Sequence, residues 1–248
     1  MALGLVKSLH GTAFINGSWV DAHDGSIFEV TNPADETVIA EVANCGEEET
    51  KQAINAAVAA LPVWSALPAK QKSSILRKWF ELITANIEEL AELLTLEQGK
   101  PIAEARAEIA YGASYIEWFA EEAKRIYGDT IPAPGPDKRI ITLKQAVGVV
   151  ACITPWNFPN AMLTRKIAPA LAAGCTVVCK PANETPLSAL ILADYALKAG
   201  IPDGVINILC GKTNEIGETL TTSKDVRKLT LPVQPRMERS LPPIAQKP

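Results

Sequence analysis

The sequence predicts an α/β fold in which an open parallel sheet is flanked by helices. Short apolar segments such as CTVVCKP (175–181) and GVINILCG (204–211) have the length and the β-branched content of fully buried strands. They alternate with amphipathic segments of helical length, which is the order that βαβ units require. Ligands of such sheets bind beyond the carboxyl ends of the strands, here at 154–157, 180–183 and Gly211. We therefore expect a ligand of nucleotide size at this edge.

The composition is that of a globular protein and argues against several classes of partner. The 248 residues are 48% apolar and 21% charged, with a formal net charge of −4. That charge provides no basic surface for nucleic acid or for an anionic membrane. No apolar run reaches the roughly 18–20 residues that span a bilayer, and the N-terminus lacks the pattern of a secretory signal. We expect a cytoplasmic protein that binds neither nucleic acid nor membrane.

Cysteine and histidine usage indicates a reducing compartment and argues against a metal site. Five cysteines show no regular pairing, and three of them lie in apolar runs, where a free thiol packs as a small apolar group. The two histidines, His10 and His23, are too few for a histidine-based metal site or a Ser-His triad. We therefore expect no disulfide and no bound metal.

Two hairpins are predicted near the start of the chain. In AFINGSWVDA, Asn16 and Gly17 separate two β-prone flanks, which favours a two-residue hairpin turn. In SIFEVTNPADETVIAEV, Asn32 and Pro33 start the second turn.

Three helices are predicted next. The first runs from Glu47 to Leu61, behind acidic residues that suit a helix N-terminus. The second extends over 69–96 as one helix and is ended by EQGKP, and the third begins at Pro101 and ends near Tyr127. Core packing is expected for four aromatic residues of these helices, Trp79, Phe80, Trp118 and Phe119.

The second half of the chain supplies the strands of the sheet. IPAPGPDK (131–138) is a proline-rich connector, and RIITLKQAVGVVACI (139–153) is strand material. Beyond it, helices are predicted at 161–174, 186–200 and 214–223, and strands at 175–181, 204–211 and from 226 onward.

Two polar residues at the predicted edge are candidate ligand contacts. Lys180 closes a buried strand before Pro181, so we expect its ammonium to reach over the crevice, where a ribose or a phosphate would suit it. A solvated lysine at a strand end is the alternative. Asn157 lies between Pro155 and Pro159 as a fixed amide donor, as a developing oxyanion requires. Its alternative is a turn asparagine that bonds its own backbone.

Short motifs supply the family resemblance. No G-x-G-x-x-G follows any strand, and GKTNEIG alone is typical of an ordinary turn. However, PWNFP, APALAAGC and KPA followed by TP, in this order and spacing, resemble the aldehyde dehydrogenase superfamily. The segment 96–132 looks like the succinate-semialdehyde dehydrogenase branch, and the resemblance covers residues 12–230.

The resemblance implies a domain organisation. It suggests N-terminal hairpins and helices at 1–133 and a linker with an oligomerisation-type β-hairpin at 134–150. A Rossmann-like, cofactor-binding βαβ part follows at 151–230. The family would form homo-oligomers, which we do not expect of a chain of this length.

The resemblance also implies roles for residues at the edge. The family's PWNFP asparagine donates its amide to the oxyanion of a thiohemiacetal, so Asn157 would take that role. Trp156 and Asn157 would contact the cofactor. The KPA segment and the residue after it would bind the adenosine ribose of the cofactor through Lys180, Pro181, Ala182 and Asn183.

Two further residues bear on cofactor and substrate. A glutamate in place of Asn183 would repel the 2′-phosphate of NADP, whereas the neutral amide tolerates it, so we expect NADP or NAD. Arg165 matches an arginine that, in succinate-semialdehyde dehydrogenases, clamps the distal carboxylate of the substrate. The implied function is NAD(P)-dependent oxidation of succinate semialdehyde, or of a similar small-molecule semialdehyde such as glutarate semialdehyde, to the diacid.

The pattern breaks at its C-terminal end. The family's nucleophilic cysteine and general-base glutamate lie in GQxC and ELGG segments that this sequence lacks, and none of its five cysteines is expected to replace the nucleophile. Residues 231–248 contain five prolines, against thirteen in the preceding 230 residues, and are expected to be a disordered tail outside the family pattern. Deleting one base from a coding of the family's Phe-Thr-Gly-Ser-Thr turn reproduces 231–237, so we interpret the tail as a frameshifted reading. The alternative function is therefore a catalytically inactive, truncated remnant.

Overall fold

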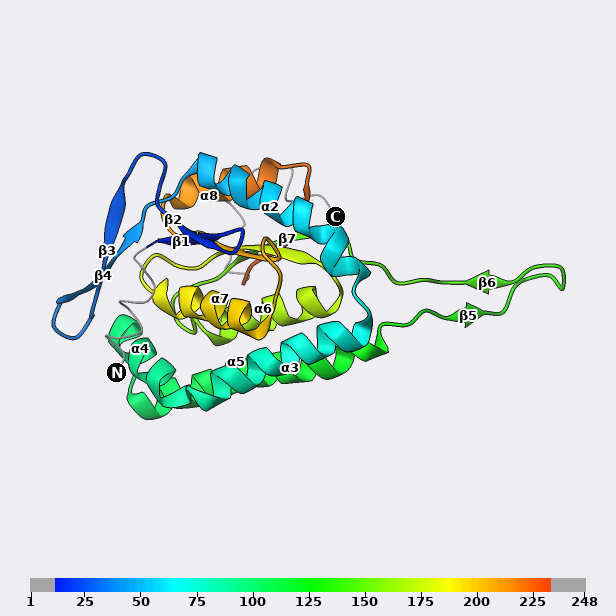
Figure 1. Cartoon of the computed structure of the whole chain (residues 1–248), viewed down its shortest axis with the longest axis horizontal. Helices are drawn as coiled ribbons and strands as arrows, with labels where there is room; N and C mark the ends of the chain where they lie inside the picture. The colour runs from blue at the N-terminus through cyan, green and yellow to red at the C-terminus, as the bar shows by residue number, and fades with distance from the viewer. Residues whose placement is uncertain (1–11, 233–248) are drawn as a thin grey trace.

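A six-stranded sheet lies at the centre of the computed structural model, which describes residues 12–232 (Figure 1). In sheet order the strands are β10 (Val226–Thr230), β7 (Val149–Ile153), β8 (Thr176–Lys180), β9 (Ile206–Ile208), β1 (Ala13–Ile15) and β2 (Ser18–Val20). The neighbours β10, β7, β8 and β9 are parallel, which confirms the predicted βαβ arrangement. Strands β1 and β2 extend the sheet in the antiparallel sense, so the sheet is mixed. The local sequence of a hairpin does not specify this pairing.

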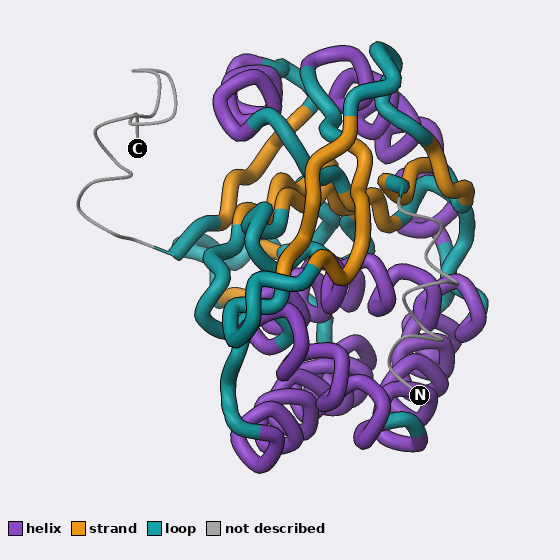
Figure 2. The backbone as a smooth tube through the Cα atoms, turned by 90° about the vertical axis from the view of Figure 1, so that its left-hand side faces the viewer, coloured by secondary structure: helices purple, strands orange, loops and turns teal. Residues whose placement is uncertain are grey.

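Helices cover both faces of the sheet in layers (Figures 1 and 2). They are α2 (Glu47–Ala66), α3 (Ala69–Ala85), α4 (Ile87–Gln98), α5 (Ile102–Glu122), α6 (Ala161–Ala172), α7 (Leu187–Ala199) and α8 (Thr213–Thr222), with a 3-10 turn η1 (Ala123–Arg125) after α5. Helices α2 and α8 lie on one face, and α6 and α7 lie on the other. Helices α3, α4 and α5 form an outer layer against α6 and α7.

The central strands are buried on both faces. In β7, Val150 and Cys152 belong to the core on the side of α6 and α7, whereas Val149 and Ala151 belong to the core beneath α2 and α8. Successive residues thus face opposite sides, as the period of two of a strand requires. Because both faces are covered, the strand sequences are continuously apolar.

The two predicted N-terminal hairpins are confirmed. Asn16 and Gly17 join β1 to β2 with φ of 53° and 75°, both in the left-handed region that a type I′ turn requires. The second hairpin pairs β3 (Ile27–Thr31) with β4 (Val38–Ala43).

A third hairpin protrudes from the body of the molecule (Figure 1). It pairs β5 (Thr130–Ile131) with β6 (Ile140–Ile141), and the proline-rich connector lies between these strands. The strand material predicted at 139–153 is therefore not continuous, because β6 pairs with β5 away from the body and β7 begins only at Val149.

The single helix predicted over 69–96 is wrong. Helix α3 ends at Ala85 and α4 begins at Ile87, with Asn86 in a non-helical conformation between them (φ −115°, ψ 24°). The Asn86 side-chain amide donates a hydrogen bond to the Leu82 carbonyl oxygen at 2.8 Å, which satisfies a carbonyl at the end of α3. Apolar residues recur at helical spacing on both sides of the break, so periodicity alone does not reveal it.

Core packing of the four helix aromatics is confirmed for three and wrong for one. Trp79 is fully buried, and Phe80 and Phe119 are partly buried against the core. Trp118 is 64% exposed. The inward face of α5 is set by residues such as Ile116, and a residue two positions along a helix lies on the opposite side.

The expected disordered tail and its interpretation as a frameshifted reading lie outside the described residues from position 233 onward.

Candidate functional site at the carboxyl edge of the sheet

The carboxyl ends of three parallel strands meet at one edge of the sheet, as the sequence predicts. Ile153 of β7 is in register with Lys180 of β8, and the amide of Thr154 donates to the carbonyl oxygen of Lys180 at 3.1 Å. The amide of Leu209, just beyond β9, donates to the carbonyl oxygen of Cys179 at 2.9 Å. The segments that follow these strands therefore lie side by side.

The segment after β7 presents its side chains to solvent at this edge. Trp156 is 53% exposed, Phe158 is 42% exposed, and Asn157 between them is also exposed. The amide of Met162 donates to the Phe158 carbonyl oxygen at 2.9 Å, so the segment leads directly into the first turn of α6. Among residues 12–232, nothing bonds the side-chain amide of Asn157, which leaves its N–H groups available to a ligand.

Two buried charged residues that the sequence reasoning missed hold this segment. The Lys100 ammonium is 2.5 Å from a carboxylate oxygen of Glu108 and donates to the Asn157 carbonyl oxygen at 3.0 Å. Glu108 in turn accepts from the amides of Asn160 and Ala161. Lys100 belongs to the EQGKP sequence, which local patterns identify only as a helix stop, and no local signal connects it to PWNFP more than fifty residues later.

Lys180 does not reach over the crevice, so that expectation is wrong. Its residue is only 3% exposed, and its ammonium donates to the Pro181 carbonyl oxygen at 2.9 Å and to Asn183 Oδ1 at 3.0 Å. Burial lowers the pKa of Lys180, while Cys210 and Glu184 oppose that shift. The chain after β8 folds back over Lys180, and the ammonium stabilises this turn through its bonds to Pro181 and Asn183.

Asn183 joins the ends of β8 and β9. Its amide group donates to the Gly211 carbonyl oxygen at 2.8 Å, and its Oδ1 accepts from the Gly211 amide at 3.2 Å as well as from Lys180. One N–H of the Asn183 amide is left over for a ligand. Pro181 is buried and Ala182 is half-buried in the same turn, so this segment offers a ligand mainly its backbone.

Arg165 lies in a separate hollow next to the edge. This pocket of about 560 Å³ is lined by α5, α6 and β10, and its lining includes Tyr115, Lys166 and Thr230 but not Asn157. Arg165 interacts with the Tyr115 hydroxyl. A hydrogen bond with Tyr111 raises the pKa of Tyr115, burial adds to that shift, and Arg165 opposes it. Within the described part of the chain, Arg165 pairs with no carboxylate. The structure thus brings the ends of β7 and β8, which lead into 156–157 and 180–183, to one edge of the sheet, and it places Arg165 in a separate pocket.

None of the five cysteines is placed to act as a nucleophile. All are free and buried. Burial, reinforced by Glu49, raises the pKa of Cys45 to about 12, and burial also raises the pKa of Cys210 and of Cys179, whose thiol hydrogen-bonds that of Cys152. Reactive cysteines need a thiolate and access; all five thiols lack access, and the raised pKa also disfavours the thiolate at Cys45, Cys179 and Cys210.

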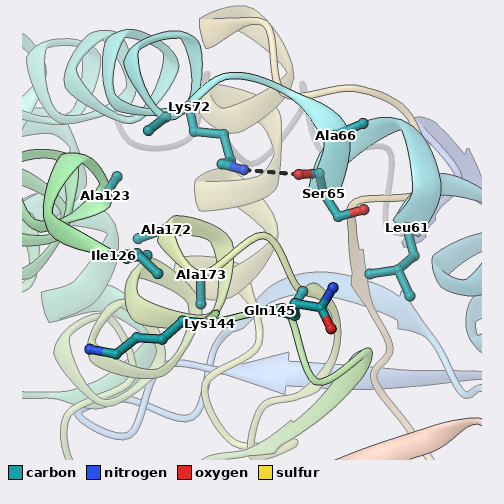
Figure 3. A pocket seen from close by; sticks show the side chains of 12 residues that line it. Leu61, Ser65, Ala66, Lys72, Ala123, Ile126, Lys144, Gln145, Ala172 and Ala173 are labelled. Atoms are coloured by element: carbon teal, nitrogen blue, oxygen red, sulfur yellow. Dashed lines mark hydrogen bonds between the residues drawn. The ribbon is translucent and has the colours of Figure 1, made fainter. Parts of the chain in front are cut away.

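A further pocket, of about 480 Å³, lies at the opposite, amino-terminal edge of the sheet (Figure 3). Residues 144–146, just before β7, and Ala172 and Ala173, just before β8, are part of its lining. In it, the Lys72 ammonium donates to the Ser65 carbonyl oxygen at 3.2 Å in the last turn of α2 (Figure 3). The Lys72 ammonium therefore lies at the C-terminus of α2, where it interacts favourably with the negative partial charge of the helix end.

Residues 12–232 show neither a candidate membrane span nor a candidate metal cluster. No helix there is both long and apolar enough to cross a membrane. No group of three or more His, Cys, Asp or Glu side chains in that part could hold a metal ion.

Comparison with known proteins assigns the family. The model of the aldehyde dehydrogenase family matches residues 19–236. Over 241 residues the chain is 54% identical to a glutarate-semialdehyde dehydrogenase of Pseudomonas aeruginosa, covering 97% of this chain and 50% of that protein. It is 55% identical over 229 residues to an NADP(+) succinate-semialdehyde dehydrogenase of Escherichia coli, covering 92% of this chain and 48% of that protein.

A solved structure agrees with these matches. The crystal structure of succinate-semialdehyde dehydrogenase from Burkholderia pseudomallei superposes with a TM-score of 0.94 at 48% identity, over 96% of this chain and 50% of that chain. The chain thus spans about half the length of the relatives that it matches. With the family model matched over most of its length, the chain belongs to the aldehyde dehydrogenase family.

Proposed function

We propose that this chain is the cofactor-binding half of an enzyme that oxidises a small semialdehyde carboxylate to the diacid with NADP or NAD. The observation that carries the proposal is the meeting of the Asn157 segment with residues 180–183 at the carboxyl ends of adjacent parallel strands. Relatives whose names specify succinate- and glutarate-semialdehyde oxidation support the substrate class, and one of them names NADP(+).

In this proposal Asn157 donates a side-chain hydrogen bond to the oxyanion that forms from the substrate carbonyl. Its side-chain amide is exposed and free of bonds within the described residues, while its backbone carbonyl oxygen is fixed by Lys100. An amide N–H held in this way stabilises the negative charge that develops on a carbonyl oxygen under nucleophilic attack. Replacing such a donor costs about 100- to 1,000-fold in kcat.

The cofactor would lie along the same edge, with Trp156 and Asn157 at one end and the turn 180–183 at the other. When bound, the nicotinamide supplies the hydride acceptor of the oxidation. The buried Lys180 ammonium holds the turn in shape through Pro181 and Asn183, so the ligand would meet the backbone of the turn and the remaining N–H of Asn183. Because this side chain carries no negative charge, it accommodates a 2′-phosphate. Asn183→Glu is expected to raise KM for NADP more than KM for NAD.

Arg165 would select a substrate that carries a distal carboxylate. The guanidinium has no carboxylate partner in the described part of the chain, and Tyr115 adds a hydroxyl beside it. A guanidinium binds a carboxylate bidentately through two parallel N–H···O bonds. In a fusion of residues 12–230 to the complementary half of the P. aeruginosa relative, Arg165→Ala should raise KM for succinate semialdehyde far more than KM for an uncharged aldehyde. Arg77→Ala, at an exposed ion pair with Glu117, is the matched control. Equal effects of Arg165→Ala on both substrates would contradict the assignment.

A second candidate function is a catalytically inactive remnant that retains only a partial nucleotide site. The burial of all five thiols favours it for the chain by itself. NADPH formation from succinate semialdehyde by the purified 248-residue chain separates the two candidates, and we expect none. Activity above that of a blank would contradict the remnant and would require a nucleophile other than these thiols.

A further inference from the structure

Lys100 is a buried lysine whose ammonium has three partners at one point of the fold. Its side chain is only 9% exposed. The ammonium is 2.5 Å from Glu108 Oε2, 3.0 Å from the Asn157 carbonyl oxygen and 4.2 Å from the centre of the Phe158 ring. The last distance is that of a cation–π contact. Two of the three partners are therefore consecutive residues of the PWNFP segment.

Glu108 holds the residues that follow. Its side chain is 1% exposed, and its Oε1 accepts from the amide of Asn160 at 3.0 Å and from that of Ala161 at 3.2 Å. These amides begin α6, where the free N–H groups and the helix dipole favour a carboxylate. A glutamate of α5 therefore caps α6, and the lysine that neutralises it binds the segment just before that cap.

The pair fixes the backbone on both sides of the Asn157 side chain. The carbonyl oxygen of Asn157 is held by Lys100, and the start of α6 three residues later is held by Glu108. Gly112 contributes to the close approach of α5, because a Cβ there would lie 2.1 Å from Asn160 Oδ1. The Asn157 side chain has no support of its own in the described residues, so its direction depends on this backbone.

We propose that Lys100 and Glu108 are positioning residues that aim the Asn157 amide at the reacting carbonyl oxygen. The proposal rests on the proposed function for the role of Asn157. Lys100 and Glu108 touch no substrate in it; they act through the backbone at 157–161. A displacement of about 1 Å at a reacting group can cost up to about 100-fold in rate, so loss of the clamp is expected to lower kcat and to leave substrate binding nearly unchanged.

The first experiment measures the clamp in the full 248-residue chain. Amide hydrogen exchange is compared for the wild type, Lys100→Met, Glu108→Gln and the conservative Lys100→Arg. We expect Lys100→Met and Glu108→Gln to speed exchange at the amides of Asn160 and Ala161 by at least about tenfold, and Lys100→Arg to restore most of the protection. The matched control is Lys124→Met, which removes an exposed ion pair with Glu121 near the end of α5. Equal exchange at 160–161 in all variants would overturn the clamp.

The second experiment tests positioning in the fusion of residues 12–230 to the complementary half of the P. aeruginosa relative. We expect Lys100→Met to lower kcat by about 10- to 100-fold, with KM for the semialdehyde and for NADP changed less than about threefold. In an Asn157→Ala background the same substitution should lower kcat less than about twofold, because the donor that it positions is gone. Full additivity of the two substitutions would overturn positioning and leave a merely structural ion pair. An Asn157→Ala variant with wild-type kcat would instead overturn the proposed function, and the role of the clamp with it.

Discussion

Replacing Glu97 by glutamine tests how the outer helical layer supports the edge of the sheet. Glu97 is in α4 and is 3% exposed, and within residues 12–232 no cation pairs with it. Its two carboxylate oxygens accept from the amides of Leu187 and Ser188, each at 2.8 Å, at the start of α7. Burial raises the pKa of Glu97 from 4.5 to about 7, with Glu108 adding to the shift and the bonds from residues 187 and 188 opposing it.

This raised pKa makes the free energy of unfolding depend on pH in one direction. The folded carboxyl keeps its proton up to about pH 7, whereas the unfolded one loses it near pH 4.5. The stability that Glu97 provides is therefore complete below about pH 4.5, falls as the pH rises towards 7, and is constant above that. Each tenfold change in the acid constant is worth about 1.4 kcal/mol, so the whole change is about 3 kcal/mol. Between pH 5 and pH 8 we expect about 2 to 3 kcal/mol of it.

Glu97→Gln removes the titration and keeps the shape. Urea unfolding followed by tryptophan fluorescence at pH 5, 6, 7 and 8 gives the free energy of unfolding of both proteins. The advantage of the wild type over the variant should shrink by about 2 to 3 kcal/mol from pH 5 to pH 8. Glu121→Gln, at an exposed ion pair on α5, is the control and should show a difference of less than about 0.5 kcal/mol at every pH. A constant difference for Glu97→Gln, or one that grows with pH, would show that the amides of α7 hold the carboxylate ionised and would refute the reasoning.

Three other predictions concern stability and reactivity. Gly112→Ala should lower the free energy of unfolding by about 1 to 3 kcal/mol because its Cβ would collide with Asn160, whereas Gly217→Ala in α8, with nothing within 4 Å, should raise it by about 0.5 to 1 kcal/mol; chemical unfolding measures both. Asn183→Ala should cost about 1 to 3 kcal/mol in the same measurement, since Lys180 and Gly211 each lose a partner, and an unchanged midpoint would contradict this. The five thiols should react with a thiol reagent only as fast as the folded chain opens, and rapid modification of any of them in the native protein would contradict their burial.

The sequence predicted the parallel sheet, and the edge at which the proposed site lies, because the strands of that sheet depend on local patterns. Apolar runs of strand length identify β7 and β8, and the polar residues that follow them mark the carboxyl edge. The orientation of Lys180 was mispredicted because the turn after β8 folds back on it, and local sequence does not show where a long side chain finds its acceptors. The break at Asn86 was missed for a related reason, since the apolar spacing continues through it.

What local patterns could not show is the function of the outer layer. Glu97 of α4 caps α7, and Glu108 of α5 caps α6, each across more than fifty residues of sequence. Both caps lie at the helix starts that follow the strand ends of the candidate site. A glutamate in a helical segment ordinarily predicts a solvated face, and only the tertiary structure identifies these two as buried acceptors. They differ in one respect: Glu108 has Lys100 as a counter-ion, whereas Glu97 has none among the residues that the structure describes. The segment next to the neutralised cap carries the side-chain amide of Asn157, which is exposed and has no hydrogen-bond partner within 12–232. Burying an ion pair costs desolvation free energy. The attraction between the two charges offsets that cost only where the geometry is good and the remaining donors and acceptors are hydrogen-bonded. Lys100 also donates to the Asn157 carbonyl oxygen. This additional hydrogen bond is a physical reason for a lysine beside the Glu108 cap of α6 and not beside the Glu97 cap of α7.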